Sequence, residues 1–165
     1  MGIDSDTIRE GLEDYKPANM RMNISKREGV TLIADCYNAA PESMRGAIDS
    51  LSAISVEGKR IAVLGDMKEL GERSDDMHRS VGSYLARHGI DMLFTLGSSA
   101  AYIADAAIDG GMKNENVISV TDGGDKERLA SLIKEKMTKG DAILFKASRS
   151  MKLEEVIASV FAENK

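Results

Sequence analysis

Polar side chains that could bind a ligand follow two apolar runs of the sequence. Asp35 and Asn38 come just after the run VTLIA. Lys146 and Arg149 come just after the run AILF. A carboxylate accepts two hydrogen bonds and suits the hydroxyls of a ribose, whereas lysine and arginine suit a carboxylate or a phosphate. These residue types predict a site for a small ligand that carries a sugar or an anionic group.

Three other apolar runs end in a similar way. They are followed by Gly65, Asp66 and Met67, by Gly97 and Ser98, and by Thr121 and Asp122. The carboxyl ends of parallel strands meet at one edge of a sheet, and ligands of open α/β sheets bind in the crevice there. If the runs are parallel strands, all these side chains therefore lie along one edge.

Strands and helices alternate along the chain in the way that this arrangement requires. Apolar runs and period-two alternation predict strands over 20–26, 30–35, 60–64, 91–96, 117–120 and 141–146. Helical spacing of apolar residues predicts helices over 4–12, 43–54, 74–88, 100–108, 126–137 and 153–161, with Ser74 as an N-cap. Short connections between strand and helix indicate a parallel sheet with right-handed crossovers.

The first predicted strand has a different role. In segment 20–26, Met20, Met22 and Ile24 alternate with polar residues, which predicts a half-exposed strand, and the turn 27–29 leads back into the next strand. It therefore lies antiparallel at the sheet edge. We expect an α/β fold, a Rossmann-like three-layer αβα sandwich with a mostly parallel sheet of about six strands and one antiparallel edge strand.

Composition excludes several classes of protein. The 165 residues carry a net charge of −5, so nothing indicates binding to nucleic acid or to an anionic membrane. No apolar run is long enough to span a bilayer, and the amino terminus lacks the pattern of a signal peptide. Cys36 is the single cysteine, which fits a reducing compartment. We expect a cytoplasmic monomer.

Several well-known site motifs are missing. No G-x-G-x-x-G follows a strand, and no G-x-x-x-x-G-K-[ST] phosphate loop or G-x-S-x-G nucleophile elbow occurs. The few histidines and the single cysteine offer no metal-ligand spacing, so no metal site is predicted. We expect no catalytic residue in this chain, which has the features of half a site.

Each candidate also has a simpler interpretation. Asp35 and Asp66 are compatible with capping or turn roles, and Asn38 with a turn. Arg149 and Lys146 could pair with the acids of the helix that follows them. The spacing of these residues along the sequence does not decide between such structural roles and ligand binding, so both interpretations stay open.

As a set, three blocks of the sequence closely resemble the C-terminal domain of the Mur ligases. The blocks are DCYNAAPESM at 35–44, AVLGDMKELG at 62–71 with His78 beyond it, and KASRSM at 146–151. They occur in the family's order, and the resemblance runs from Arg21 to the carboxyl terminus. It is strongest to the members that add D-Ala-D-Ala to UDP-N-acetylmuramoyl-tripeptide in peptidoglycan synthesis.

The resemblance implies an ATP-dependent ligase of three domains. ATP, with Mg²⁺, would phosphorylate the carboxylate of the precursor, and the amine of the dipeptide would attack the acyl phosphate. This domain would close over the central one, exclude water and bring the amine into place. ATP and Mg²⁺ would be used by the full-length enzyme, with neither bound tightly by this part.

The resemblance also assigns roles to single residues. The residues that correspond to the ATP-binding positions are Arg21, Asp35, Tyr37 and Asn38. The residues that correspond to the block for the second substrate, D-Ala-D-Ala, are Lys146, Ser148 and Arg149. The middle block implies site-lining roles for Asp66, Glu69 and His78.

The sequence departs from the family pattern at three positions, where it has Cys36 for serine, Ala40 for asparagine and Ala147 for glycine. The first change is nearly isosteric. The second removes an amide beside the nucleotide, and the third adds a methyl group where backbone can approach a ligand. The dipeptide contacts are therefore the more weakly supported part of the assignment.

The implied organisation is an interdomain connection over residues 1–18 and the Mur ligase C-terminal domain over 19–165. The central ATPase domain and the uridine-nucleotide domain would be the partners of this domain, which we expect to be inactive alone. Two alternatives are a free-standing Rossmann-like module that binds a small phosphorylated ligand, and the C-terminal domain of a folylpolyglutamate-type ligase.

Overall fold

Six strands form a single sheet in the order β1-β2-β6-β3-β4-β5. The computed structural model describes residues 21–162. Its strands are β1 (Asn23–Arg27), β2 (Val30–Asp35), β3 (Arg60–Gly65), β4 (Met92–Leu96), β5 (Val117–Val120) and β6 (Ala142–Lys146). Its α-helices are α2 (Pro41–Ala53), α3 (Ser74–Leu85), α4 (Ala101–Asp109), α5 (Lys126–Lys136) and α6 (Leu153–Val160). The predicted helix over 4–12 lies outside the described residues.

The sheet is parallel except at one edge, as predicted. β1 pairs antiparallel with β2, whereas β2, β6, β3, β4 and β5 are parallel. Glu28 and Gly29 join β1 to β2 with φ angles of 52° and 83°, the positive values that a tight hairpin turn needs. The α/β three-layer fold expected from the sequence is thus confirmed.

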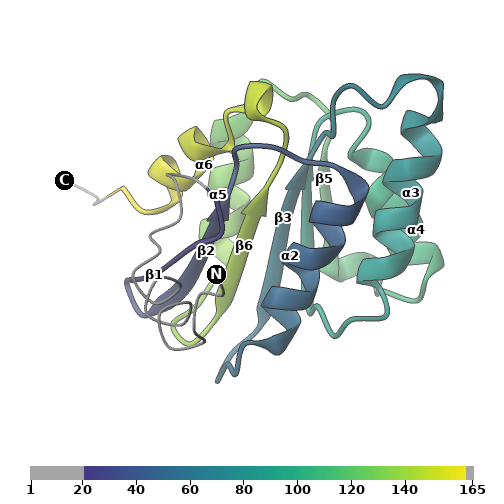
Figure 1. Ribbon diagram of the computed structural model, residues 1–165. Coiled ribbons are helices and arrows are strands. Elements are labelled where there is room, and N and C mark those ends of the chain that lie inside the picture. The colour runs from purple at the N-terminus through teal and green to yellow at the C-terminus, as the bar shows by residue number, and fades with distance from the viewer. Residues whose placement is uncertain (1–20, 163–165) are drawn as a thin grey trace, which may run out of the picture.

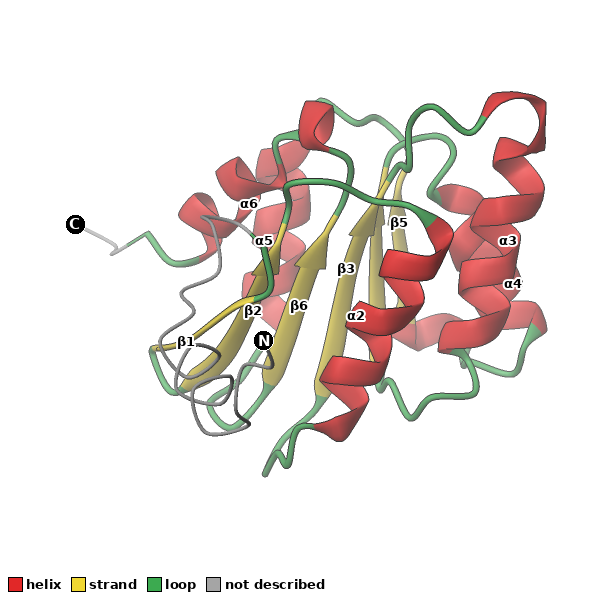
Figure 2. Cartoon of the chain, in the orientation of Figure 1, coloured by secondary structure: helices red, strands yellow, loops and turns green. Residues whose placement is uncertain are grey.

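Helices cover both faces of the sheet (Figures 1 and 2). α2, α3 and α4 lie on one face and α5 and α6 on the other. Alternate residues of each strand supply the two cores: in β6, Ile143 and Phe145 pack toward α5 and α6, whereas Ala142 and Leu144 pack toward the other helices. Both faces are buried, which explains the continuous apolar runs of the central strands.

Several predicted boundaries differ from the structure by one to three residues; the helix predicted over 74–88, for example, ends at Leu85. Two differences at the start of an element have a clear cause. The first strand begins at Asn23 rather than at residue 20, and Ile24 is 57% exposed instead of buried. No helix of the described chain covers that side of the edge strand, so period-two alternation does not guarantee burial there. Ser74 is the first residue of α3 and not its N-cap, because the 3₁₀ turn Gly71–Arg73 leads directly into the helix.

The chain order puts three switch points on the carboxyl edge of the sheet. β2 leads to α2 and β3 to α3 on one face, whereas β6, which lies between these two strands, leads to α6 on the other. The same divergence separates β4 from β5. Crevices open where neighbouring connections leave to opposite faces, so this topology offers three places for a ligand on one edge. Within residues 21–162, no helix is both long and apolar enough to cross a bilayer.

Candidate functional site

Asp35 and Lys146 form a buried ion pair at the carboxyl edge. The two residues are partners in the register of β2 and β6, so their side chains leave the sheet on the same face, toward α2. Lys146 Nζ lies 2.5 Å from Asp35 Oδ2 and donates a second hydrogen bond of 3.0 Å to the carbonyl of Asn38. The lysine side chain is 2% exposed. Its charge is therefore compensated inside the fold.

This pair forms the base of a cavity of about 320 Å³, here called the Asp35 hollow. Its lining residues are Arg21, Asp35, Tyr37, Asn38, Ser43 and Lys146. The guanidinium of Arg21 lies 4.2 Å from the centre of the Tyr37 ring, which is half-exposed. The hollow thus combines a cation, an aromatic face, a carboxylate and an amide, a set that can hold the sugar, base and phosphates of a nucleotide.

The Asp35 hollow gathers all four residues predicted to bind ATP. It also contains Lys146, which the resemblance assigned to the second substrate. Neighbouring parallel strands place Asp35 and Lys146 in one cavity and in direct contact, and the assignment of Lys146 to the second substrate stays a prediction. Sequence spacing cannot show this contact, since the two residues are far apart in the chain.

Arg149 occupies a more open position. It begins the 3₁₀ turn Arg149–Met151 after β6, and its guanidinium donates to Glu154 Oε1 at 2.7 Å. This is the ion pair that the simpler interpretation of Arg149 anticipated. The arginine side chain remains 59% exposed, so its other nitrogen atoms are accessible to a ligand.

Asp66 is a structural anchor at the end of β3. It is 3% exposed; Oδ1 accepts from the backbone N–H of Ala100 at 2.7 Å, at the start of α4, and Oδ2 accepts from Lys68 Nζ at 2.8 Å. A carboxylate stabilises a helix amino terminus. Gly97 has a φ of 114°, and a Cβ there would lie 2.3 Å from Asp66 Oδ1, so this carboxylate requires glycine beside it.

A second cavity of about 420 Å³, the Lys68 hollow, opens at the same edge beyond β3. It is lined by Asp66, Lys68, Gly97, Ser98, Thr121, Gly123, Lys126, Ser150 and Met151. Two lysines and several hydroxyls suit a carboxylate or a phosphate. Of these residues, Lys68, Lys126 and Ser150 were missed by the sequence reasoning. The available signal for Lys68 was its place beside Asp66 in the middle block.

Ser148 joins the two loops that border the hollows. Its backbone N–H donates to the Asp66 carbonyl at 3.1 Å, and its hydroxyl accepts from the N–H of Lys68 at 2.8 Å. Ser148 is buried. Ser148 therefore holds these two loops together at the carboxyl edge of the sheet, and its hydroxyl oxygen already accepts a hydrogen bond from within the protein.

His78 and Glu69 line neither hollow. His78, on α3, is 0% exposed and makes two hydrogen bonds to backbone, one at each ring nitrogen. Glu69 is exposed in the loop before α3 and has a φ of 64°. The site-lining roles suggested for these two residues gain no support from their positions.

Cys36 is a buried side chain of the core beside Asp35. Its thiol donates to the carbonyl of Phe145 at 3.4 Å. Burial, with smaller contributions from the nearby carboxylates of Glu154 and Asp35, raises the pKa of the Cys36 thiol to about 12. The thiol is thus neutral at ordinary pH, and Cys36 lines neither hollow.

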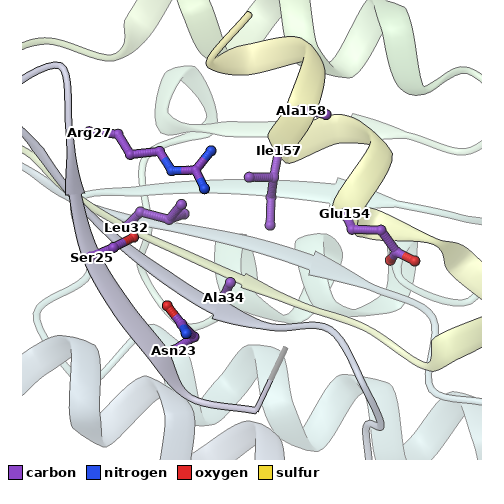
Figure 3. Close-up of a pocket in the computed structure, with 8 residues that line it drawn as sticks. All are labelled: Asn23, Ser25, Arg27, Leu32, Ala34, Glu154, Ile157 and Ala158. Atoms are coloured by element: carbon purple, nitrogen blue, oxygen red, sulfur yellow. The ribbon is translucent and has the colours of Figure 1, made fainter. Parts of the chain in front are cut away.

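A third cavity lies away from these residues, in the groove between β1 and α6 (Figure 3). It measures about 460 Å³ and is lined by Asn23, Ser25, Arg27, Leu32, Ala34, Glu154, Ile157 and Ala158. None of the predicted site residues lines it, although Glu154 is the partner of Arg149. Size alone therefore does not identify the site.

Comparison with known proteins decides the family. The model described as "Mur ligase, glutamate ligase domain" matches residues 20–149. The chain belongs to the Mur ligase family. It is 39% identical over 157 residues to the UDP-N-acetylmuramoyl-tripeptide--D-alanyl-D-alanine ligase of Bacillus subtilis, an alignment that covers 94% of this chain and 34% of that protein.

Solved Mur ligases share the fold. The MurF ligase of Thermotoga maritima in complex with ADP aligns with a TM-score of 0.74 at 30% identity, over 95% of this chain and 36% of that one. A MurF structure from Acinetobacter baumannii gives 0.81 at 27% identity, over 98% and 34%. This Mur ligase chain thus spans about a third of the length of these relatives.

In this Mur ligase domain, the three sequence blocks meet at one edge. Block 35–44 supplies the wall of the Asp35 hollow, and block 62–71 supplies part of the Lys68 hollow. Block 146–151 runs between them and contributes to both. Among residues 21–162, no group of three or more histidine, cysteine or acidic side chains is arranged to hold a metal ion.

Proposed function

We propose that this chain is the C-terminal domain of the ATP-dependent ligase that adds D-Ala-D-Ala to UDP-N-acetylmuramoyl-tripeptide during cytoplasmic synthesis of peptidoglycan. Residues 19–165 would form the domain, and residues 1–18 the end of the connection to a central ATPase domain. The observation that carries the proposal is the pair of polar hollows on one sheet edge, in a chain 39% identical to a ligase of that name.

The Asp35 hollow is the proposed wall for ATP. The carboxylate of Asp35 would accept the ribose hydroxyls, Tyr37 and Asn38 would face the adenine, and Arg21 would reach the phosphates. Arg21 suits that role because its guanidinium lies over the Tyr37 ring at the rim of the same hollow. Lys146 would orient Asp35 through their ion pair.

The Lys68 hollow is the proposed site for the carboxylate of the dipeptide. Lys68 and Lys126 are the cations of its lining; Lys68 is paired with Asp66 at 2.8 Å and Lys126 with Glu155 at 2.7 Å, and each keeps further donors for a ligand. Arg149 lies beside Ser150 of the lining. Two separate hollows on one edge allow ATP and the amine substrate to be held at the same time. A central domain closing over that edge would then exclude water from the acyl phosphate.

Mg²⁺ would arrive with the nucleotide. The described residues offer no cluster of metal ligands, so the Mg²⁺ ligands would belong to the other domains. This chain would contribute binding, orientation and exclusion of water. The acyl phosphate would form elsewhere, on the carboxylate of the precursor.

Kinetics of the full-length ligase test the two assignments against each other. Arg21→Ala should raise the KM for ATP about tenfold or more, whereas Arg149→Ala should do so for D-Ala-D-Ala, since each removes a charge-assisted contact. Each variant should leave the KM of the other substrate within about twofold. Equal effects of either variant on both substrates would contradict the separate hollows. A wild-type ligase that does not use D-Ala-D-Ala would overturn the function itself.

A further inference from the structure

His78 is placed to control the backbone at the Lys68 hollow without touching a ligand. Its Nε2 accepts a hydrogen bond of 2.9 Å from the N–H of Met67, and its Nδ1 lies 2.7 Å from the carbonyl of Ser74. Because Nε2 accepts from an N–H and Nδ1 faces a carbonyl, these contacts require the neutral ring with its proton on Nδ1. One imidazole therefore joins the end of β3 to the first turn of α3.

Met67 is the middle residue of the segment 66–68, and each residue of this segment is hydrogen-bonded to a different part of the fold. Asp66 is held by the N–H of Ala100, and the N–H of Lys68 by the hydroxyl of Ser148. Met67 itself is 2% exposed and packs in the core beneath α2 and α3. Three consecutive residues are thus held by the loop after β6, by α3 and by the N-cap of α4, and His78 supplies the contact with α3.

That segment forms one wall of the Lys68 hollow. Asp66 and Lys68 both line it, and their side chains bond each other at 2.8 Å. A shift of the Met67 backbone would move both side chains relative to Ser98, Thr121 and Lys126 across the cavity. Small displacements of a binding group have large effects on binding and orientation.

We propose that His78 is a positioning residue for the second substrate: it holds the Met67 amide and so sets Lys68 and Asp66 in the wall that receives the carboxylate of the dipeptide. This inference rests on the proposed function, since it needs the Lys68 hollow to be the dipeptide site. It explains a fully buried histidine whose two ring nitrogens bond the backbone of Met67 and Ser74, with the Ser74 hydroxyl 3.4 Å from Nδ1.

Two substitutions separate the two hydrogen bonds of the ring. Glutamine places an amide oxygen near the position of Nε2, so His78→Gln can still accept from Met67. Asparagine places its amide near Nδ1, so His78→Asn keeps a donor to Ser74 and loses the acceptor for Met67. Both variants give up packing volume, which makes each a control for the other.

Steady-state kinetics of the full-length ligase give the readout. His78→Asn should raise the KM for D-Ala-D-Ala about tenfold, because the wall that carries Lys68 and Asp66 is no longer held in place, with kcat and the KM for ATP within about twofold. His78→Gln should restore most of the affinity for the dipeptide. Val81→Ala, which removes buried volume one turn along the same helix but leaves both hydrogen bonds of His78, should lower the melting temperature without changing either KM.

The second measurement is a double-mutant cycle with Lys68→Met. If His78 acts through the wall that carries Lys68, then His78→Asn should add little to the KM of the Lys68→Met enzyme. The inference fails if His78→Asn and His78→Gln lose only stability and active enzyme, with unchanged KM values, or if the two substitutions are fully additive. A wild-type enzyme with no turnover of D-Ala-D-Ala would instead refute the proposed function.

Discussion

At the scale of single residues, the most consequential contact is the ion pair of Asp35 and Lys146. Two opposite charges on neighbouring parallel strands are buried together because strand register puts them on the same face. Desolvation of the two charges offsets much of their attraction, so the pair is better explained by the geometry that it imposes on the hollow than by net stability.

Removing one partner should therefore cost more than removing both. Lys146→Met should lower the free energy of unfolding by about 3 kcal/mol, because it leaves the Asp35 carboxylate buried without its cation. The double variant Asp35→Leu with Lys146→Met should recover a large part of that loss. Urea unfolding of the three proteins followed by circular dichroism measures both effects. Additive losses would mean that the two side chains are not coupled.

Cys36 makes stability depend on pH in the alkaline range. Burial raises its pKa from 9.0 to about 12, so the folded state holds the thiol proton more tightly than the unfolded state. The resulting stabilisation is complete below pH 9 and is lost as the pH rises toward 12. Cys36→Ala should remove this part of the dependence. The difference between the two unfolding curves from pH 8 to about 11 isolates the thiol from other titrating groups; parallel curves would contradict the assignment.

At the scale of elements, the packing of α3 against α4 depends on one glycine. A Cβ at Gly82 would lie 2.1 Å from the carbonyl oxygen of Ile103, so the two helices approach through a position that admits no side chain. Gly46 in α2 provides a matched contrast, because a Cβ there meets nothing within 4 Å.

A glycine-to-alanine substitution should therefore lower the stability of the protein at Gly82 in α3 and raise it at Gly46 in α2. Gly82→Ala should destabilise the protein by about 2 kcal/mol or more, since α3 and α4 must move apart. Gly46→Ala should stabilise it by about 0.5 to 1 kcal/mol through helix propensity. The melting temperatures of both variants, compared with that of the unchanged chain, measure the two effects. A neutral Gly82→Ala would show that the helix contact is looser than described.

At the scale of the whole molecule, the domain presents one wall of a site. Both hollows open along the carboxyl edge, and the described residues contain no phosphate loop and no metal-ligand cluster. Such a wall binds little by itself, because a ligand is buried only when a second surface covers it.

We therefore expect the 165-residue chain to show neither ATP hydrolysis nor ligation. Titration with ATP should move NMR signals around Tyr37 and Asn38, and titration with D-Ala-D-Ala should move those around Ser98 and Lys126, both only at millimolar concentrations. Arg21→Ala should abolish the first set of changes and leave the second. Turnover of ATP by the chain alone would contradict its role as a single wall.

The sequence by itself determined the alternation of strands and helices, the antiparallel edge hairpin and the identity of the polar residues at the strand ends. These follow from local patterns: apolar periodicity, turn residues and the order of three blocks. The boundaries that failed, at Asn23 and Ser74, lie where tertiary cover or a preceding turn overrides the local signal.

Only the tertiary structure decided which of those residues share a cavity. The insertion of β6 between β2 and β3 brought Lys146 against Asp35, so that both residues line the Asp35 hollow. The same topology turned Asp66 and Ser148 into anchors, and it brought Lys126 from a distant helix to the Lys68 hollow. Strand order is set by packing between segments far apart in the chain, which spacing within any one segment cannot encode.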